Sequence, residues 1–354
     1  MTASAPTSSP LHDVHDRLGA RFVDFGGWSM PVQYEGTLSE HRAVRETCGI
    51  FDVSHLGRFD LAGKGSVELL RRLLSNDVTQ VDPGRCQYTM LLNERGGVVD
   101  DIIVWRLGPD ETVVLPNCAN HDRVRDRFAA DLPAGASIAD TRATTVLLAV
   151  QGPDAPGLLE DVLGRRPRRF ACERADWRGH ELVVAGTGYT GEPGGEIIAP
   201  AAAGPELWAA LTDAGAVPAG LGARDTLRLE MGYPLWGNDL DESTTPLEAD
   251  LEWVVDWDHD FVGRDALERQ RAEGLPKRLV GFAFDDRTIP RHGHPVRTAD
   301  AAGAVTSGNF SPSLGVGIGL AYLAPPPADG DTIEVDIRGR TVVARRTDPP
   351  FLER

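Results

Sequence analysis

The hydrophobic pattern is strongest in residues 91–107, where short apolar runs surround two adjacent aspartates. Val98-Val99 and Ile102–Val104 are β-branched and follow a pair of glycines, so the stretch predicts a buried strand after a tight turn. Side chains alternate along a strand, and Asp100 and Asp101 therefore point to opposite faces. Taken alone, the pattern is most simply explained if one aspartate caps the turn and the other faces solvent.

Similar patterns predict further elements on both sides of this stretch. Alternating residues predict a strand and tight loop at Arg21–Tyr34, two short strands at Phe51–Gly63, a strand at Thr112–Leu115, and two strands around a glycine turn at Glu181–Pro200. Apolar residues at helical spacing predict helices from Thr37 to near Gly49, at Val67–Leu74, up to Phe128, at Glu206–Leu211 and at Ala223–Met231.

Two helix starts are predicted from capping chemistry. Thr37 with Glu40 forms a capping box, in which each side chain bonds a free backbone N–H of the first turn. Residues 245–248, Thr-Pro-Leu-Glu, predict another helix start, with proline at a position that suits the first turn. The first ten residues carry no such pattern and are interpreted as a short disordered lead-in.

From about Leu279 the pattern changes to short strands and turns. Residues 332–346 alternate around Arg338-Gly339-Arg340, which predicts a hairpin. This change favours a separate C-terminal β domain.

A weak internal repeat links two segments of the first two thirds of the chain. Asp60–Leu74 aligns without gaps to Ala149–Leu163, and both predict a strand, a glycine-containing turn and a helix. Duplication of an α+β unit and a chance likeness between two such units both remain open on this evidence.

Composition excludes several classes of partner. The 354 residues suffice for two or three domains, and 36 Lys and Arg against 53 Asp and Glu give a net charge of −17. Such an acidic surface repels nucleic acid and anionic lipid, so we expect neither as a partner. No apolar run approaches a membrane span, and no apolar signal segment opens the chain, which favours a cytoplasmic location.

Residues that hold metals or cofactors are sparse. The cysteines are far apart and lack CxxC spacing, so they predict no zinc or iron–sulfur site and are expected to be reduced thiols. Lys64 and Lys277 are the only lysines, which leaves few candidates for a Schiff base with pyridoxal phosphate (PLP). The segment Gly186–Gly191 matches GxGxxG, but a strand is predicted where a dinucleotide site needs a helix. Gly237–Glu242 resembles a calcium loop with ligands missing, and we interpret it as a hydrated acidic turn.

Eight motifs in order resemble one known family. They are FGGWSMP (25–31), FDVSHLG (51–57), QYTMLLNERGGVVDD (87–101), NCAN (117–120), VQGP (150–153), GYTGEPGGE (188–196), GLGARDTLRLEMGYPLWGND (220–239) and TSGNFSPSLGVGIGLA (306–321). Together they resemble the aminomethyltransferases, or T proteins, of the glycine cleavage system, over nearly the whole chain.

The resemblance implies an α+β fold in which duplicated α+β folate-binding domains surround a central pocket, with a C-terminal β-barrel-like domain. We expect residues 1–54 and 140–250 to form a discontinuous first folate-binding domain and residues 55–139 a second α+β domain. Residues 251–354 would form the C-terminal domain.

The resemblance also implies a reaction. Such an enzyme takes the methylene carbon from the aminomethyl-lipoyl arm of the H protein to tetrahydrofolate, giving 5,10-methylenetetrahydrofolate, ammonia and the dihydrolipoyl arm. Tetrahydrofolate is the co-substrate, the lipoylated H protein is the partner, and no metal, flavin or PLP is needed. A carboxylate suits this chemistry because it stabilises the cationic iminium character that forms as ammonia leaves, and it can accept the N10 proton.

The residue roles that follow come from matched motif positions. Asp101 is expected to be the catalytic carboxylate, with Asp100 on the other face of the strand. Glu196 is expected to bind the 2-amino and N3 hydrogens of the pterin, and Arg224 to pair with a substrate carboxylate or fix the pocket. The folate cavity is expected to be lined by Tyr88, Leu56, Asn117 and Tyr233. His55 is interpreted as a packed, hydrogen-bonded histidine rather than a base.

Two features depart from the family pattern. Pro193 and Gly195 replace an acidic residue and a bulky residue in the glycine turn, and the chain stops at Arg354, where relatives usually continue. The main alternative is a folate-dependent demethylase or methyltransferase of the same fold. The non-catalytic folate protein of iron–sulfur repair carries a Lys-Gly-Cys motif that this chain lacks.

Overall fold

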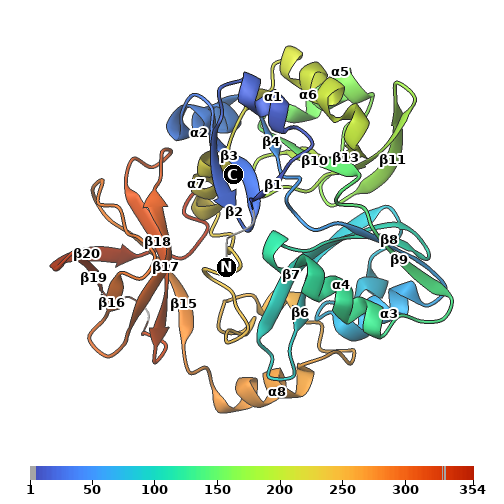
Figure 1. Cartoon of the computed structure of the whole chain (residues 1–354). Coiled ribbons are helices and arrows are strands. Elements are labelled where there is room, and N and C mark those ends of the chain that lie inside the picture. Colours follow the sequence, from blue (N-terminus) through green and yellow to red (C-terminus); the bar gives the residue numbers. More distant parts are fainter. Residues whose placement is uncertain (1–4, 329, 331) are drawn as a thin grey trace. The chain divides into compact units, whose positions relative to one another are not determined.

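The apolar run Thr145–Gln151 forms β10, which is buried over most of its length inside a six-stranded sheet (Figure 1). The structure, a computed structural model, describes residues 5–328, 330 and 332–354. The strand order of this sheet is β11 (Cys172–Trp177), β12 (His180–Ala185), β13 (Gly194–Pro200), β10, β4 (Gly49–Asp52) and β14 (Val217–Pro218). Most strand pairs are antiparallel, and β14 pairs with β4 in parallel.

Two helices contribute apolar faces to the core of this sheet. They are α5 (Ala155–Leu163) and α6 (Gly204–Asp213), and their leucines join the side chains of β10, β12 and β13 in one buried cluster. The part of the chain that supplies this sheet and its two helices also contains α1 (His12–Arg17), α2 (Thr37–Glu46) and α7 (Leu221–Glu230). The predicted helices at Glu206–Leu211 and Ala223–Met231 are confirmed, with ends shifted by a few residues.

The N-terminal segment is ordered where the structure describes it, which corrects the predicted disordered lead-in. Thr7–Ser8 forms β1, which pairs in parallel with β3 (Trp28–Gln33), and β2 (Arg21–Phe25) pairs with the other edge of β3. The Ser9 hydroxyl donates to the Asp52 carboxylate, and both side chains are buried. Residues 1–4 lie outside the described residues.

The predicted aspartate strand forms β7 (Val98–Gly108) in a five-stranded sheet. The strands in sheet order are β6 (Arg85–Leu92), β7, β8 (Glu111–Leu115), β5 (Phe59–Gly63) and β9 (Ala136–Asp140). Helices α3 (Ser66–Leu73) and α4 (His121–Ala130) follow β5 and β8 along the chain. The two strands predicted in Phe51–Gly63 exist, but β4 and β5 belong to different sheets.

The C-terminal third forms a closed barrel. Its strands in order are β15 (Arg278–Ala283), β18 (Gly317–Ala324), β17 (Ala302–Phe310), β16 (Pro295–Arg297), β19 (Ile333–Ile337) and β20 (Arg340–Arg346). Arg338 and Gly339 join the last two strands with φ of 56° and 85°, the left-handed pair that a tight hairpin turn requires. The predicted hairpin and the predicted barrel-like C-terminal domain are confirmed.

The chain divides into two compact units. The first consists of Met1–Arg71, Asp77–Tyr88 and Ile102–Arg224, and the second of Arg72–Asn76, Thr89–Asp101 and Asp225–Arg354. The second unit contains the barrel and α8 (Arg264–Glu273). No helix among the described residues is long and apolar enough to cross a membrane. The three-domain boundaries expected from the sequence stay a prediction.

The two predicted helix starts have different outcomes. Glu40 accepts from the backbone N–H of Gly36, as in a capping box, but Gly36 is the N-cap, and no side chain caps the helix there. Thr245 and Glu248 do exchange their two bonds, at 3.2 and 2.9 Å. However, only a turn follows, so the helix predicted from Thr245 is wrong. The capping bonds at Thr245 therefore form, but the packing of the surrounding chain stops the helix after one turn.

The repeated segments have the predicted elements. The first contains β5 and α3, and the second contains β10 and α5. Gly63 and Gly152, which align in the repeat, both have positive φ, at 95° and 143°. A Cβ at either position would come within 2.3 Å of a backbone oxygen, so both turns require glycine.

The turn Gly237–Glu242 is exposed at Asp241 and Glu242, as the hydrated-turn interpretation expects, but Asp239 departs from that interpretation. Asp239 is 1% exposed and accepts from Arg228 Nη1 at 2.9 Å, from Ser307 Oγ at 2.8 Å and from the Leu235 N–H at 2.9 Å. Asp241 accepts from the backbone and hydroxyl of Ser243. Asp239 therefore acts as an internal acceptor that ties the segment after α7 to the barrel strand β17, whereas the bonds of Asp241 to Ser243 are local.

We predict that Asp239→Ala strongly destabilises the protein. Removing one partner of a buried, hydrogen-bonded ion pair costs about 3–5 kcal/mol, because the other charge stays buried. The measurement is thermal and denaturant-induced unfolding of the purified variant. Asp285→Ala is the control, because its pair with Arg345 is exposed, and it should cost less than about 1 kcal/mol. Equal losses in the two variants would contradict the assigned role.

Candidate functional site

The loop after β4 places Leu56 and His55, and a buried arginine holds it. Arg58 is fully buried and donates to the carbonyl oxygens of Ser54 and Leu56 at 3.3 and 3.4 Å. Gly57 has no room for a side chain, since a Cβ would lie 2.5 Å from Pro116 and 2.7 Å from His121. Leu56 is half-buried, so its side chain retains exposed apolar surface at the end of a rigid turn.

His55 is buried in this loop but lacks the predicted hydrogen bond at one nitrogen. Its side chain is 2% exposed and packs edge-on against Phe25, with ring centroids 5.3 Å apart. Nδ1 has no partner among the described residues, which corrects the hydrogen-bonded interpretation. Burial, followed by the charge of Arg224, lowers the pKa of His55 to about 3. The imidazole is therefore neutral at physiological pH.

The loop between β12 and β13 is held in place by hydrogen bonds from the side chain of Gln151. This side chain is 1% exposed; its Nε2 donates to the Thr187 carbonyl at 3.2 Å, and its Oε1 accepts from Thr190 Oγ1 at 3.0 Å. Arg45 holds the far end of the loop through the Thr190 carbonyl at 2.6 Å and Glu192 at 2.8 Å. The GxGxxG segment is thus a braced loop that leads into β13 without a helix, as predicted.

Glu196 lies on β13, opposite Ala149 of β10 and Ala185 of β12. It is 5% exposed, and the hydroxyl of Thr187 donates to its Oε2. Burial raises the pKa of Glu196, while the Thr187 bond and the charge of Arg224 oppose that rise. The site is a desolvated carboxylate with one oxygen engaged by a hydroxyl, which suits a ligand with paired N–H donors.

Arg224 on α7 stands over the ring of Tyr189, with its guanidinium carbon 4.5 Å from the ring centroid. Its helix turn is anchored through Gly220, whose carbonyl accepts from the Arg224 N–H and whose N–H donates to the buried Glu40. The charge of Arg224 acts on both Glu196 and His55. The first unit therefore gathers an acid, a phenol and a neutral imidazole around one arginine.

Two other predicted residues of the first unit are partly exposed. Tyr88 lies on β6 and is half-buried. Asn117 is half-buried at the N-cap of η2 (Cys118–Asn120), in the turn predicted between Asn117 and Asn120. Gly195, one of the departures from the family pattern, is packed so closely that a Cβ would lie 2.9 Å from the Ala185 carbonyl.

The aspartate pair lies in the second unit, on β7. Asp100 is fully buried together with Val98 and Ile102, whereas Asp101 is half-buried on the other face, so the predicted alternation is confirmed. The simple explanation with a solvent-facing aspartate is wrong for Asp100. Asn93 organises the preceding turn, with its side-chain oxygen accepting from the Arg95 and Gly97 N–H groups.

The turn before β7 requires its second glycine. A Cβ at Gly97 would lie 1.9 Å from the Glu242 carbonyl, and the Asn93 amide donates to the same carbonyl at 3.0 Å. The Val98 N–H donates to the Thr244 carbonyl at 2.9 Å. These contacts hold β7 in register at Val98, two residues before Asp100.

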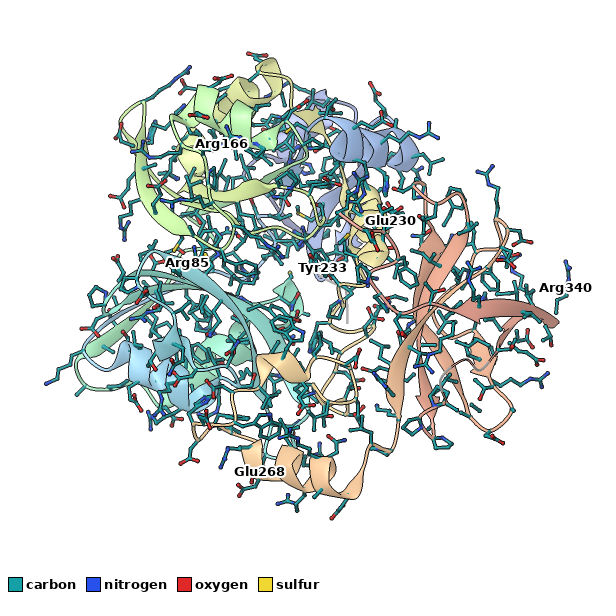
Figure 2. All side chains as sticks on the ribbon, turned by 180° about the vertical axis from the view of Figure 1, so that it is seen from behind. Arg85, Arg166, Glu230, Tyr233, Glu268 and Arg340 are labelled. Atoms are coloured by element: carbon teal, nitrogen blue, oxygen red, sulfur yellow. The ribbon has the colours of Figure 1, made fainter. Side chains whose placement is uncertain are left out.

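Tyr233 also belongs to the second unit. It follows α7 by three residues, its N–H donates to the Arg228 carbonyl at 3.0 Å, and its side chain is half-buried near Glu230 (Figure 2). Tyr88 and Arg224 end segments of the first unit, and Asp101 ends a segment of the second.

Two family models together match most of the chain. The GCVT N-terminal domain matches residues 11–259, and the glycine cleavage T-protein C-terminal barrel domain matches residues 277–353. The chain belongs to the glycine cleavage T-protein family. It is similar to the aminomethyltransferase of Rubrobacter xylanophilus, with 48% identity over 98% of this chain and 94% of the relative. It is also similar to that of Frankia alni, with 46% identity over 97% of both chains.

A solved T protein agrees with this assignment. The crystal structure of glycine cleavage system aminomethyltransferase T from Bartonella henselae is 31% identical, with a TM-score of 0.92 over 99% of this chain and 98% of that one. The resemblance inferred from eight motifs is thus confirmed, and with it the class of enzyme: an aminomethyltransferase of the glycine cleavage type.

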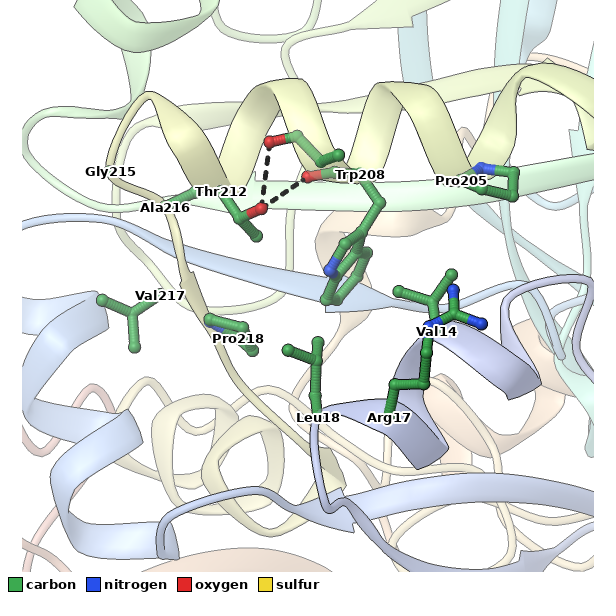
Figure 3. A pocket seen from close by; sticks show the side chains of 11 residues that line it. Val14, Arg17, Leu18, Pro205, Trp208, Thr212, Gly215, Ala216, Val217 and Pro218 are labelled. Carbon is green, nitrogen blue, oxygen red and sulfur yellow. Dashed lines mark hydrogen bonds between the residues drawn. The ribbon is translucent and has the colours of Figure 1, made fainter.

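A groove on the first unit of this T-protein family member contains none of the predicted site residues. It has a volume of about 490 Å³ and lies where α1 and α6 meet the chain before α7, with the Trp208 ring projecting from α6 toward Val14 and Leu18 (Figure 3). Its lining is mostly apolar, with Arg17 at one end. Size alone therefore does not locate the candidate site.

The sequence analysis missed three residues that shape the site of this T-protein family member. Thr187, Gln151 and Tyr189 bond, brace or stack on the predicted residues. Gln151 and Tyr189 lie within motifs that carried the resemblance, and Thr187 directly precedes one of them. For each of the three, the available signal was a polar side chain directly beside a glycine. That signal marks a position but does not identify the partner of the side chain.

We predict that Glu196→Gln stabilises the ligand-free protein at neutral or higher pH. Because the folded-state pKa of Glu196 is raised, its charge costs stability above that pKa, and the cost disappears as pH falls through it to the unfolded value. The melting temperature of the variant should exceed that of wild type at pH 8 and converge with it near pH 5. A variant that melts lower at pH 8 would mean that the carboxylate stabilises the fold.

Proposed function

We propose that the protein transfers the methylene carbon of an S-aminomethyl-lipoyl group on the H protein to tetrahydrofolate, with release of ammonia. The full-length match to T proteins carries this proposal. The Glu196–Arg224 cluster adds support, because a buried carboxylate near a cation is the chemistry that a pterin with two N–H donors and a charged glutamate tail would need.

Asp101 is the proposed catalytic carboxylate. It has the partial exposure that a residue facing a substrate requires, whereas Asp100 is enclosed in the core. As the C–N and C–S bonds of the aminomethyl group break and its carbon bonds to N5 and N10 of tetrahydrofolate, Asp101 would stabilise the positive charge that develops on the carbon and accept the proton from N10. The two protons lost from N5 and N10 are passed on to the leaving amine and the leaving sulfur. Ammonia and the thiol of the dihydrolipoyl arm are the other products.

The other predicted site residues are proposed to bind tetrahydrofolate. Glu196 would accept the 2-amino and N3 hydrogens, Arg224 would pair with a carboxylate of the folate tail or fix the pocket, and Leu56 would provide an apolar wall. The folate cavity would be completed by Tyr88, Asn117 and Tyr233, whose side chains are each half-buried.

The proposal includes no metal, flavin or PLP. It rests on the spacing of the cysteines, which are all free, and on the two lysines at positions 64 and 277. Reduced thiols also support a cytoplasmic location. The net charge of −17 opposes nucleic acid and anionic membranes as partners.

We predict that Asp101→Asn reduces turnover about 10²–10⁴-fold with a much smaller effect on folate binding, because the lost interaction strengthens in the transition state. The assay is single-turnover release of ammonia from aminomethylated H protein with tetrahydrofolate. Asp100→Asn is the matched control, and it should cost stability more than rate. A fully active Asp101 variant, or a folded Asp100 variant without activity, would refute the assignment.

We predict that Glu196→Gln weakens tetrahydrofolate binding at least tenfold. The amide presents one acceptor and one donor to the two pterin donors, and charge-assisted bonds contribute roughly 1.5–3 kcal/mol each. Titration calorimetry or fluorescence quenching measures the affinity. Unchanged affinity in a folded variant would place the pterin elsewhere.

A further inference from the structure

Thr187 has a single hydroxyl proton, and it is used on Glu196. The side chain is 6% exposed, and its Oγ1 donates to Glu196 Oε2. A hydroxyl that donates to an ionised carboxylate forms a charge-assisted bond, which is stronger than a neutral one. Glu196 is thereby left with Oε1 and the remaining lone pair of Oε2 for a ligand.

The backbone of Thr187 is fixed independently of Glu196. Gln151 Nε2 donates to its carbonyl at 3.2 Å, and a Cβ at Gly188 would lie 1.8 Å from Gln151 Oε1. On the other side, the chain leaves β12 at Ala185, two residues before Thr187, and Ala185 pairs with Glu196. The hydroxyl therefore approaches the carboxylate from one direction, and the carboxylate must orient toward it.

The pKa of Glu196 depends on burial and on the charges near it in the described part of the first unit. The positive charge of Arg224 lowers its pKa, and burial raises it. Cys86 is a further titratable neighbour, because the charge of Glu196 contributes to the raised pKa of that thiol. A neutral, buried thiol provides no compensation, so the carboxylate depends on Thr187 and Arg224 to remain ionised.

We propose that Thr187 is a positioning residue that holds Glu196 ionised and directs its carboxylate toward the paired N–H donors of the pterin. This inference rests on the proposed function of Glu196 and adds the residue that makes it effective. Thr187 touches no reacting atom, so its loss acts on folate recognition rather than on the transfer step.

The test compares Thr187→Val, which keeps the shape but lacks the donor, with Thr187→Ser, which keeps the donor. The Glu196 carboxylate is titrated in the ligand-free protein by isotope-edited infrared spectroscopy, and its band is assigned with Glu196→Gln. Loss of one charge-assisted bond should raise the midpoint by about 1–2 pH units in the valine variant. The serine variant should stay within a few tenths of wild type.

Folate binding provides the second measurement. At pH 7 the dissociation constant for tetrahydrofolate should rise about tenfold in Thr187→Val and by less than threefold in Thr187→Ser. The deficit should shrink as the pH is raised through the midpoint of the valine variant, because the carboxylate ionises again. In turnover with aminomethylated H protein, KM for tetrahydrofolate should rise while kcat changes less than threefold.

Thr190→Val is the matched control, because it removes a buried hydroxyl from the same loop that bonds Gln151 rather than Glu196. It should leave the Glu196 midpoint unchanged even where it lowers the melting temperature. Thr187→Ala replaces the valine variant if valine prevents folding.

Three results would overturn the proposal. They are an unchanged Glu196 midpoint in the valine variant, an equal shift in the serine variant, or a shifted midpoint with wild-type folate affinity while Glu196→Gln weakens binding. The failure of the proposed function looks different. In that case Glu196→Gln itself leaves folate affinity unchanged, whatever the midpoint of the Thr187 variants.

Discussion

A charge that leaves water must find hydrogen bonds or a counter-charge, and this constraint organises the protein. Glu196 sits between strands with 5% exposure, and its environment consists of the Thr187 hydroxyl and the field of Arg224. The net pKa is raised, so the fold does not fully compensate the carboxylate. A buried acid that is left short of donors is suited to a ligand that brings donors of its own.

Two other buried acids, Asp52 and Glu40, each have several partners and hold the scaffold together. Burial by itself would raise the pKa of Asp52, but His15 at 2.9 Å, Ser54 and Ser9 lower it overall. Glu40 bridges three backbone N–H groups, at Tyr34, Gly36 and Gly220. These acids join segments distant in sequence, and in this they differ from Glu196, the proposed ligand-binding carboxylate.

Glycine and backbone carbonyl groups set the positions of the loops. Gly57, Gly97 and Gly188 each lie against another group at a distance that excludes a Cβ. Arg58 and Gln151 use their several donors on main-chain oxygens and so fix the loops that carry Leu56 and Thr187. The candidate side chains therefore project from loops held by backbone contacts.

Much of this could be predicted from the chain alone. Alternation placed Asp100 and Asp101 on opposite faces, capping and periodicity located most helices, and the motif order identified the family. These features are local, because strand and helix periods and turn chemistry act over a few residues. The helix predicted at Thr245 failed because tertiary context ended the segment after one turn, although its capping bonds formed.

Contacts between distant residues were decided only by the tertiary structure. The sequence shows Asp239 in an acidic turn, and only folding brings Ser307 and Arg228 to it and removes water. It shows Thr187 beside a glycine, and the pairing of β12 with β13 aims its hydroxyl at Glu196. The sequence by itself determined the elements, the family and the candidate acids. Which acids are satisfied by the fold and which require a ligand depends on desolvation and on partners far along the chain, and these exist only once the chain is packed.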